Sequence, residues 1–218
     1  MVNNKEGVEN RRTLEVEVGV ELTPDPRQIE LLQMWAESIE AKDRYTARHC
    51  ARVAEYTERL GRVMGLEGTQ LEWLRTGSMM HDVGKLAVPS SILNKPGPLD
   101  ESEWAVMRKH PEWGDRLAAK MQLPGVVRSV VRHHHERWDG SGYPDRLGER
   151  AIPLVARMLC VVDVYDALTS ERSYRRALTR DEALTVMQEE SGATLDPGIY
   201  RTFRRLMTGD ERAQVWVG

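Results

Sequence analysis

This chain of 218 residues has few cysteines, no long apolar run and little excess of charge of either sign. Its two cysteines, Cys50 and Cys160, are too few for a disulfide framework and fit a reducing, intracellular compartment. No uninterrupted apolar run reaches the roughly 18 residues that a membrane span needs, and residues 1–10 lack the apolar centre of a signal peptide. We therefore expect a cytoplasmic protein that does not enter the membrane.

The net charge of −3 argues against nucleic acid as a partner. Broad, sequence-independent binding to nucleic acid usually needs a basic stripe, which this composition does not favour. A small anionic ligand can still bind a local basic pocket. Hydrophobic residues make up 40% of the chain and charged residues 30%, which is typical of a globular domain. We find no internal repeat, no low-complexity segment and no second domain.

Helical periodicity dominates the chain from residue 27 onward. Apolar positions recur at three- and four-residue spacing over residues 27–41, 46–64 and 69–82. Later helix starts are marked by Asp100 with Glu103, Pro124, Pro153, Thr179 with Glu182, and Asp196-Pro197. Pro111 should kink or restart the helix that carries His110. We predict an all-α domain over residues 27–208 and a tail over residues 209–218.

The N-terminal arm, residues 1–26, differs from the rest. Residues 14–22 (LEVEVGVEL) alternate apolar with acidic residues or glycine, which is typical of a strand. No second strand of similar quality is available to pair with it. The alternatives are a contact with another subunit of a homodimer or with a partner protein, a vestige of an upstream domain, and a loose extended arm. The arm is too short to form a sensory domain of its own.

The stretch MMHDVGKL, residues 79–86, is the strongest local signal of chemistry. An apolar helical run leads into the adjacent His81 and Asp82, and Lys85 follows about one turn later. Burying an imidazole and a carboxylate is costly unless each is paired, hydrogen-bonded or bound to a metal. An isolated His-Asp pair is more often an ordinary helix end, so the other histidines must decide.

Those histidines, with one more carboxylate, predict a metal centre. Asp163 interrupts the most apolar helix of the chain, where an unpaired carboxylate should not be tolerated. Neighbouring imidazoles on a helix point about 100° apart, so each can face a different ion of a close pair. The candidate ligands are His49, His81, Asp82, His110, His134, His135 and Asp163. This set is too large for one tetrahedral ion and suits two ions bridged by a carboxylate and a water.

Residues 45–205 resemble the HD-GYP branch of the HD-domain metal-dependent phosphohydrolases. The resemblance rests on His81-Asp82-Val83-Gly84-Lys85, on HHERWDGSGYP (134–144), and on LNKPGPLDESEW (93–104), KHPEWG (109–114) and DVYDALTSERSYR (163–175). It implies an all-α helical bundle around a two-metal site. It also implies an enzyme of bacterial second-messenger signalling that hydrolyses cyclic di-GMP to pGpG, to GMP or to both.

The resemblance assigns the same seven residues as metal ligands and leaves His133 spare. Two divalent ions, iron or manganese, are expected. Family members with a third ion use a glutamate at the position of Tyr45, so a third metal is not expected here. The implied mechanism is attack on phosphorus by a metal-activated hydroxide, with Asp82 as the bridging carboxylate and Lys85 offsetting charge in the transition state.

The same resemblance implies a set of substrate contacts. They are Lys85, Gly142, Tyr143, Pro144, Arg172 and Arg175, the two arginines for phosphate or a guanine edge. Without the resemblance, Arg172 and Arg175 would be a solvated cluster at a helix end. Asp166, three residues after Asp163, is expected to support the ligands. Two alternatives stay open: a phosphohydrolase of another cyclic dinucleotide or nucleotide, and a receptor that binds cyclic di-GMP without cleaving it.

Overall fold

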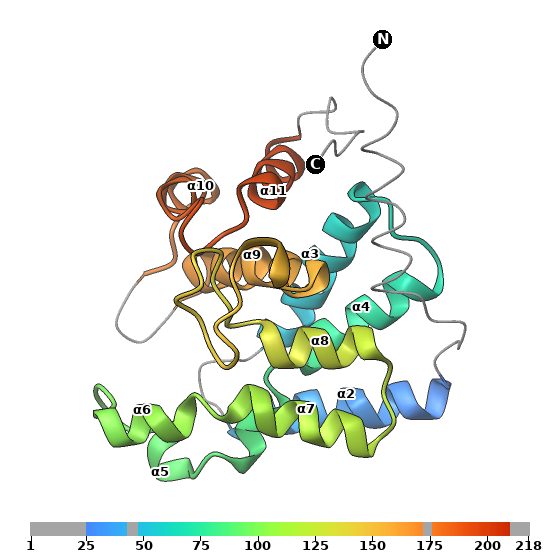
Figure 1. Cartoon of the computed structure of the whole chain (residues 1–218), viewed down its shortest axis with the longest axis vertical. Coiled ribbons are helices and arrows are strands. Elements are labelled where there is room, and N and C mark those ends of the chain that lie inside the picture. Colours follow the sequence, from blue (N-terminus) through green and yellow to red (C-terminus); the bar gives the residue numbers. More distant parts are fainter. Residues whose placement is uncertain (1–24, 43–47, 172–175, 210–218) are drawn as a thin grey trace.

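The computed structural model describes residues 25–42, 48–171 and 176–209 (Figure 1). Every secondary-structure element named within these ranges is a helix. The predicted all-α class is therefore confirmed. In chain order the elements are α2 (Pro26–Lys42), α3 (His49–Val63), α4 (Thr69–Met80), the 3₁₀ helix η1 (Val83–Ala87), α5 (Ser90–Leu93), α6 (Glu101–Met107), α7 (His110–Lys120), α8 (Gly125–His133), the 3₁₀ helix η2 (Glu149–Ala151), α9 (Leu154–Thr169), α10 (Arg180–Glu189) and α11 (Pro197–Thr208). The predicted strand over residues 14–22 lies outside the described residues.

Helix α9 is the centre of the bundle, as its apolar sequence predicts. It packs against α3, α8, α10 and α11, and it is drawn across the middle of Figure 1. Ten of its sixteen residues are buried, which leaves this helix almost no polar face. Because full burial of one large aliphatic side chain contributes about 1.5–3 kcal/mol, this helix stabilises the whole assembly. A second layer is formed by α4, α7 and α8, with α4 packed between α3 and α8.

The predicted helix starts are present. Asp100 with Glu103 and Thr179 with Glu182 form capping boxes at the starts of α6 and α10. Asp196 accepts hydrogen bonds from the backbone N–H groups of the first turn of α11. Helix α6 ends at Met107 and α7 begins at His110, so the chain restarts at Pro111 rather than kinking.

Two helix boundaries differ from the prediction, and both lie at the candidate site. The helix predicted over residues 69–82 ends at Met80, and the chain continues as the 3₁₀ helix η1. Gly84 explains the change, because a Cβ there would lie 1.8 Å from the carbonyl oxygen of His110. The close approach of η1 to α7 thus takes the chain out of the α-helical path. The helix predicted from residue 46 begins at His49, after Arg48 in a left-handed conformation.

The helices also bear on the expected absence of a membrane span. Among the described residues, no helix combines the length and the apolar character that crossing a bilayer requires.

Candidate metal centre

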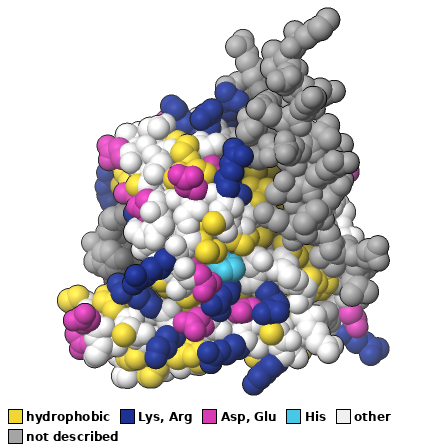
Figure 2. Space-filling model, in the orientation of Figure 1, with side chains coloured by type: hydrophobic (Ala, Val, Ile, Leu, Met, Phe, Trp, Pro, Cys, Tyr) yellow, Lys and Arg dark blue, Asp and Glu magenta, His cyan; other side chains and the backbone are white. Residues whose placement is uncertain are grey.

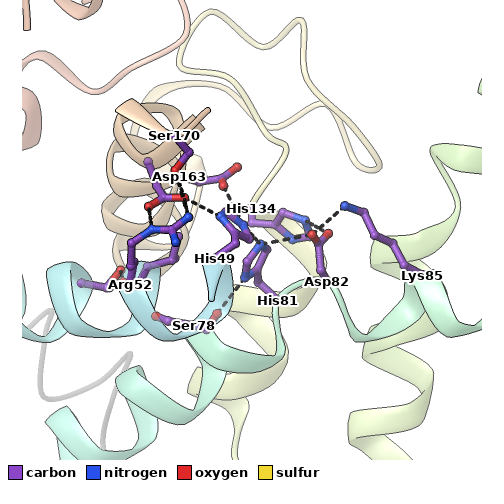
Figure 3. A network of polar contacts seen from close by, with 12 residues as sticks. His49, Arg52, Ser78, His81, Asp82, Lys85, His134, Asp163 and Ser170 are labelled. Atoms are coloured by element: carbon purple, nitrogen blue, oxygen red, sulfur yellow. Dashed lines mark hydrogen bonds and ion pairs between the residues drawn. The ribbon is translucent and has the colours of Figure 1, made fainter. Parts of the chain in front are cut away.

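The seven predicted ligands lie in two adjacent clusters. The His49 cluster contains His49, His81 and Asp163, and the Asp82 cluster contains Asp82, His110, His134 and His135. Within each cluster the ligand atoms, one from each residue, lie within 4.8 Å of one another. Figure 3 shows the labelled members of both clusters pointing toward a common space between α3, α9 and the end of α4. Every predicted ligand is therefore placed with at least two others.

Three of the imidazoles are oriented by the ends of helices. The Nδ1 atom of His81 lies 2.7 Å from the carbonyl oxygen of Ser78. His110 and His134 make the same contact, at 2.9 Å, with the carbonyl oxygens three residues before them. The last turn of a helix has carbonyls without an intrahelical partner, and each ring uses one of them. This hydrogen bond places the proton on Nδ1 and directs Nε2 toward the cluster.

His49 is oriented by side chains instead. Its Nδ1 atom lies 2.8 Å from a carboxylate oxygen of Asp166. Asp166 in turn accepts hydrogen bonds from Arg52, at 2.6 and 2.9 Å, and from Ser170. Burial works to raise the pKa of Asp166, but the contacts with His49 and Arg52 outweigh it and lower the pKa to about 2. Asp166 is thus an ionised group behind His49.

The donor atoms fit bound cations. The Nε2 atoms of His49 and His81 lie 3.4 Å apart, and those of His110 and His134 lie 3.1 Å apart. In neutral rings whose protons sit on Nδ1, these facing nitrogens present lone pairs to each other, and a cation between them removes the repulsion. Imidazole and carboxylate are ligands that first-row divalent metals accept.

Asp82 connects the two clusters through its two carboxylate oxygens. Oδ1 lies 3.2 Å from Nε2 of His110, and Oδ2 lies 3.4 Å from Nε2 of His81. Lys85 approaches the same carboxylate, with Nζ 2.7 Å from Oδ2. Burial favours the neutral carboxyl, but the charges of Lys85 and His81 hold the pKa of Asp82 well below its usual range. Asp82 is therefore ionised and faces both clusters.

The imidazoles differ in the charge that their surroundings favour. Burial works to lower the pKa of His81, but the Asp82 carboxylate more than offsets it, and the pKa is raised to about 9. Burial lowers the pKa of His134 to about 4 and that of His135 well below its ordinary value. The position of His81 thus favours positive charge, which a bound cation also supplies, and the other two rings are neutral, as metal ligands must be.

The GYP loop, residues 136–147, covers one side of the Asp82 cluster. The ring of Tyr143 stacks on that of His135, with centroids 4.8 Å apart and planes inclined by 28°. Glu136 is buried, and its carboxylate accepts the backbone N–H groups of Asp145 and Leu147 at 2.7 and 3.1 Å. A Cβ on Gly142 would lie 2.4 Å from the backbone nitrogen of Arg137, so the loop closes only with glycine there.

Several residues of the site were not identified from the sequence, and some predictions fall outside the described residues. Arg52 supports the ligand His49 through Asp166, and Glu136 holds the GYP loop; their signals were a basic residue three positions after His49 and an acid next to the histidine tract. His133 contacts Asp145 and belongs to neither cluster. The predictions for Tyr45, Arg172 and Arg175 concern residues outside the described ranges.

Comparison with known families identifies the class of protein. A family model described as "HD domain" matches residues 33–199, which is most of the chain. The chain therefore belongs to the HD domain family, as the motifs indicated, and it carries the Gly142-Tyr143-Pro144 of the HD-GYP branch. The His and Asp clusters agree with the divalent-metal dependence of this family.

Individual relatives place the chain more closely. It is 41% identical over 170 residues to the 3'3'-cGAMP-specific phosphodiesterase 2 of Vibrio cholerae, covering 77% of this chain and 33% of that protein. It is 39% identical over 175 residues to a cyclic di-GMP phosphodiesterase response regulator of Xanthomonas campestris pv. campestris, covering 79% of this chain and 46% of that protein. The chain thus spans between a third and a half of the length of these relatives.

A solved structure supports the same fold. The HDG"Y"P protein Bd1817 from Bdellovibrio bacteriovorus superposes with a TM-score of 0.63 and 17% sequence identity, covering 94% of this chain and 71% of that one. At this identity the likeness concerns the fold alone.

Proposed function

We propose that this chain is a two-metal phosphodiesterase that hydrolyses cyclic di-GMP to pGpG, to GMP or to both. The observation that carries the proposal is the carboxylate of Asp82, which faces one cluster with each oxygen while Lys85 lies against it. A carboxylate that faces two ion sites suits two-metal phosphodiester hydrolysis. Relatives named as cyclic dinucleotide phosphodiesterases support the choice of substrate class.

In this proposal each cluster holds one divalent ion, iron or manganese. Bound there, the ions would polarise a phosphate oxygen and lower the pKa of water. The chain's own residues do the rest. His49, His81, His110 and His134 hold their Nε2 atoms in fixed directions through their Nδ1 hydrogen bonds. Lys85 places a positive charge beside Asp82, where it offsets the negative charge that develops on the phosphate.

Substrate contacts complete the proposal. Tyr143, held against His135 by the GYP loop, lines the approach to the Asp82 cluster together with Gly142 and Pro144. We assign phosphate contacts to Arg172 and Arg175 from their place in the family motif. On the face drawn in Figure 2, a histidine reaches the surface with both basic and acidic side chains around it.

A second substrate, 3'3'-cGAMP, is favoured by one observation. The Vibrio cholerae relative named for it is as similar to this chain as the relative named for cyclic di-GMP. The two dinucleotides share the ring of sugars and phosphates and differ in one base. The metal clusters therefore do not discriminate between them, and the residues that contact the bases must.

Turnover of a substrate panel tests the proposal. The protein is purified without oxygen, loaded with iron or manganese, and its metal content measured on the sample that is assayed with cyclic di-GMP, 3'3'-cGAMP and cyclic di-AMP. We expect about two metals per chain and hydrolysis with cyclic di-GMP as the preferred substrate. Preference for 3'3'-cGAMP would reassign the substrate. Full metal occupancy with nucleotide binding but no cleavage would replace the enzyme by a receptor.

A further inference from the structure

The last residue of α2, Lys42, makes an unusual set of contacts with the turn that carries Lys85. Its Nζ atom lies 2.7 Å from the carbonyl oxygens of Leu86 and Val88 and 3.3 Å from that of Lys85. The Lys42 carbonyl accepts a hydrogen bond from the side-chain amide of Asn94 at 2.9 Å. One half-buried residue thus ties the end of α2 to the segment that follows the His-Asp pair.

The chemistry of η1 explains why a cation lies there. A 3₁₀ helix of five residues has few internal hydrogen bonds, and several carbonyls gather at its C-terminal end. Of these, the Lys85 carbonyl also accepts the backbone N–H of Val88 at 3.0 Å. Such carbonyls carry partial negative charge, which a cation near a helix C-terminus stabilises. A lysine ammonium has three N–H donors and no acceptor, so it can serve three carbonyls at once.

Two of these carbonyls, those of Lys85 and Leu86, belong to η1, the element that also carries the Lys85 side chain. The Lys85 N–H donates to the carbonyl of Asp82 at 2.9 Å, and the Lys85 side chain returns to the Asp82 carboxylate (Figure 3). The Lys42 ammonium therefore contacts the backbone of Lys85, the candidate catalytic lysine, and that of the next residue, Leu86. Movement of the turn would displace Nζ of Lys85 but would leave the imidazoles in place, because they are oriented by α4, α6, α8 and Asp166.

We propose that Lys42 is a positioning residue that fixes the turn of η1 and thereby holds Lys85 for its part in phosphodiester hydrolysis. The inference rests on the proposed function for its kinetic consequence only. Its structural consequence, a turn that loosens when Lys42 loses its donors, is independent of any substrate.

Two measurements on the full chain test this role. Lys42→Met keeps the length of the side chain and removes the three donors. Amide hydrogen exchange over residues 83–88 should become roughly tenfold faster, with exchange in α8 unchanged. With metal-loaded protein and cyclic di-GMP, kcat should fall about tenfold while KM and metal content stay as in the unchanged protein. Lys42→Arg should recover most of both, because a guanidinium also offers several donors.

Arg201→Met is the control, since it removes an exposed cation of α11. It should leave exchange and kcat unchanged. If Lys42→Met does not fold, Lys42→Gln, which keeps two N–H donors without the charge, should show a smaller acceleration over the same residues.

The outcomes separate this proposal from the proposed function. Unchanged exchange over residues 83–88 in Lys42→Met, or in Lys42→Gln if that variant has to be used, overturns the role of Lys42. Wild-type protein without turnover contradicts the phosphodiesterase and leaves exchange to decide the role of Lys42. Faster exchange with an unchanged kcat in an active enzyme also overturns the role of Lys42, because the position of Lys85 would then not depend on the turn.

Discussion

The two clusters are built from the same kinds of ligand but are supported differently. In the Asp82 cluster, backbone carbonyls at helix ends orient His110 and His134. In the His49 cluster one such carbonyl orients His81, but His49 depends on the ionised Asp166 and its partner Arg52. A backbone carbonyl persists as long as the helix does, but a side-chain network can be removed by one substitution. The His49 cluster should therefore be the easier of the two to weaken without unfolding the protein.

The largest expected effect removes the feature that the clusters share. Asp82→Ala should lower kcat/KM by on the order of 10³-fold or more, because each ion site loses a ligand atom. Metal content per chain should fall together with activity. Asp181→Asn, which changes an exposed acid of α10, is the control. Retention of full metal content by Asp82→Ala would contradict the shared-carboxylate arrangement.

A smaller effect should separate the clusters. Asp166→Asn removes the charged acceptor behind His49, and loss of such a supporting group typically costs about 10–100-fold in metal affinity. A metal titration should show one weakened site and one unchanged site. Asp115→Asn is a matched control because Asp115 also pairs with an arginine, Arg128, at 2.8 Å, but contacts neither cluster. Equal weakening of both sites would show that Asp166 does not act on the His49 cluster alone.

The GYP loop offers a milder change on the side of the Asp82 cluster. Glu136→Gln keeps one acceptor oxygen for the backbone N–H groups of Asp145 and Leu147 but directs an amide group at the other. Because Tyr143 is held by this loop, KM for cyclic di-GMP should rise about tenfold at unchanged metal content. The exposed Glu149→Gln should behave as the unchanged protein. A loss of metal instead of a rise in KM would assign Glu136 to the ligands rather than to the loop.

The smallest effect is a difference in pH dependence between metal-free variants. The folded-state pKa of His134, about 4, is lowered, so the stability that this ring contributes is lost as pH falls from about 6.5 toward 4. The folded-state pKa of His81, about 9, is raised, so its contribution is complete below about pH 6.5 and is lost as pH rises through 9.

Thermal unfolding measured from about pH 4 to pH 9 follows the loss of stability on the acidic side and on the alkaline side. His134→Gln should reduce the loss of stability at acidic pH, and His81→Gln should reduce the loss of stability at alkaline pH. If both substitutions change stability on the same side of the pH range, the two rings do not differ in charge as described.

Much of the site was predictable because its signals are local. A carboxylate within an apolar helix, such as the half-buried Asp163, needs a partner wherever the chain folds, and its helix can be recognised from periodicity. The capping boxes that start α6 and α10 are local for the same reason. All seven predicted ligands accordingly lie in one of the two clusters.

The rest depends on contacts between distant segments. The end of α4 at Met80 follows from the approach of α7 to Gly84, and Lys42 finds its carbonyls 43 to 46 residues further along the chain. Likewise, the sequence suggests that Arg52 is a solvated helical residue, and only the fold shows that α9 places Asp166 beside it. Periodicity and motif spacing contain no information about such approaches, so these residues could not be assigned from the sequence.

The contact between His49 and Asp166 spans 117 positions of the chain, whereas that between His110 and His134 spans 24. During synthesis the chain emerges from its N-terminus, so all four residues of the Asp82 cluster are available before α9 has been made. The His49 cluster lacks both Asp163 and the support of Asp166 until then. The chain therefore supplies every ligand of the Asp82 cluster before it supplies the last ligand of the His49 cluster.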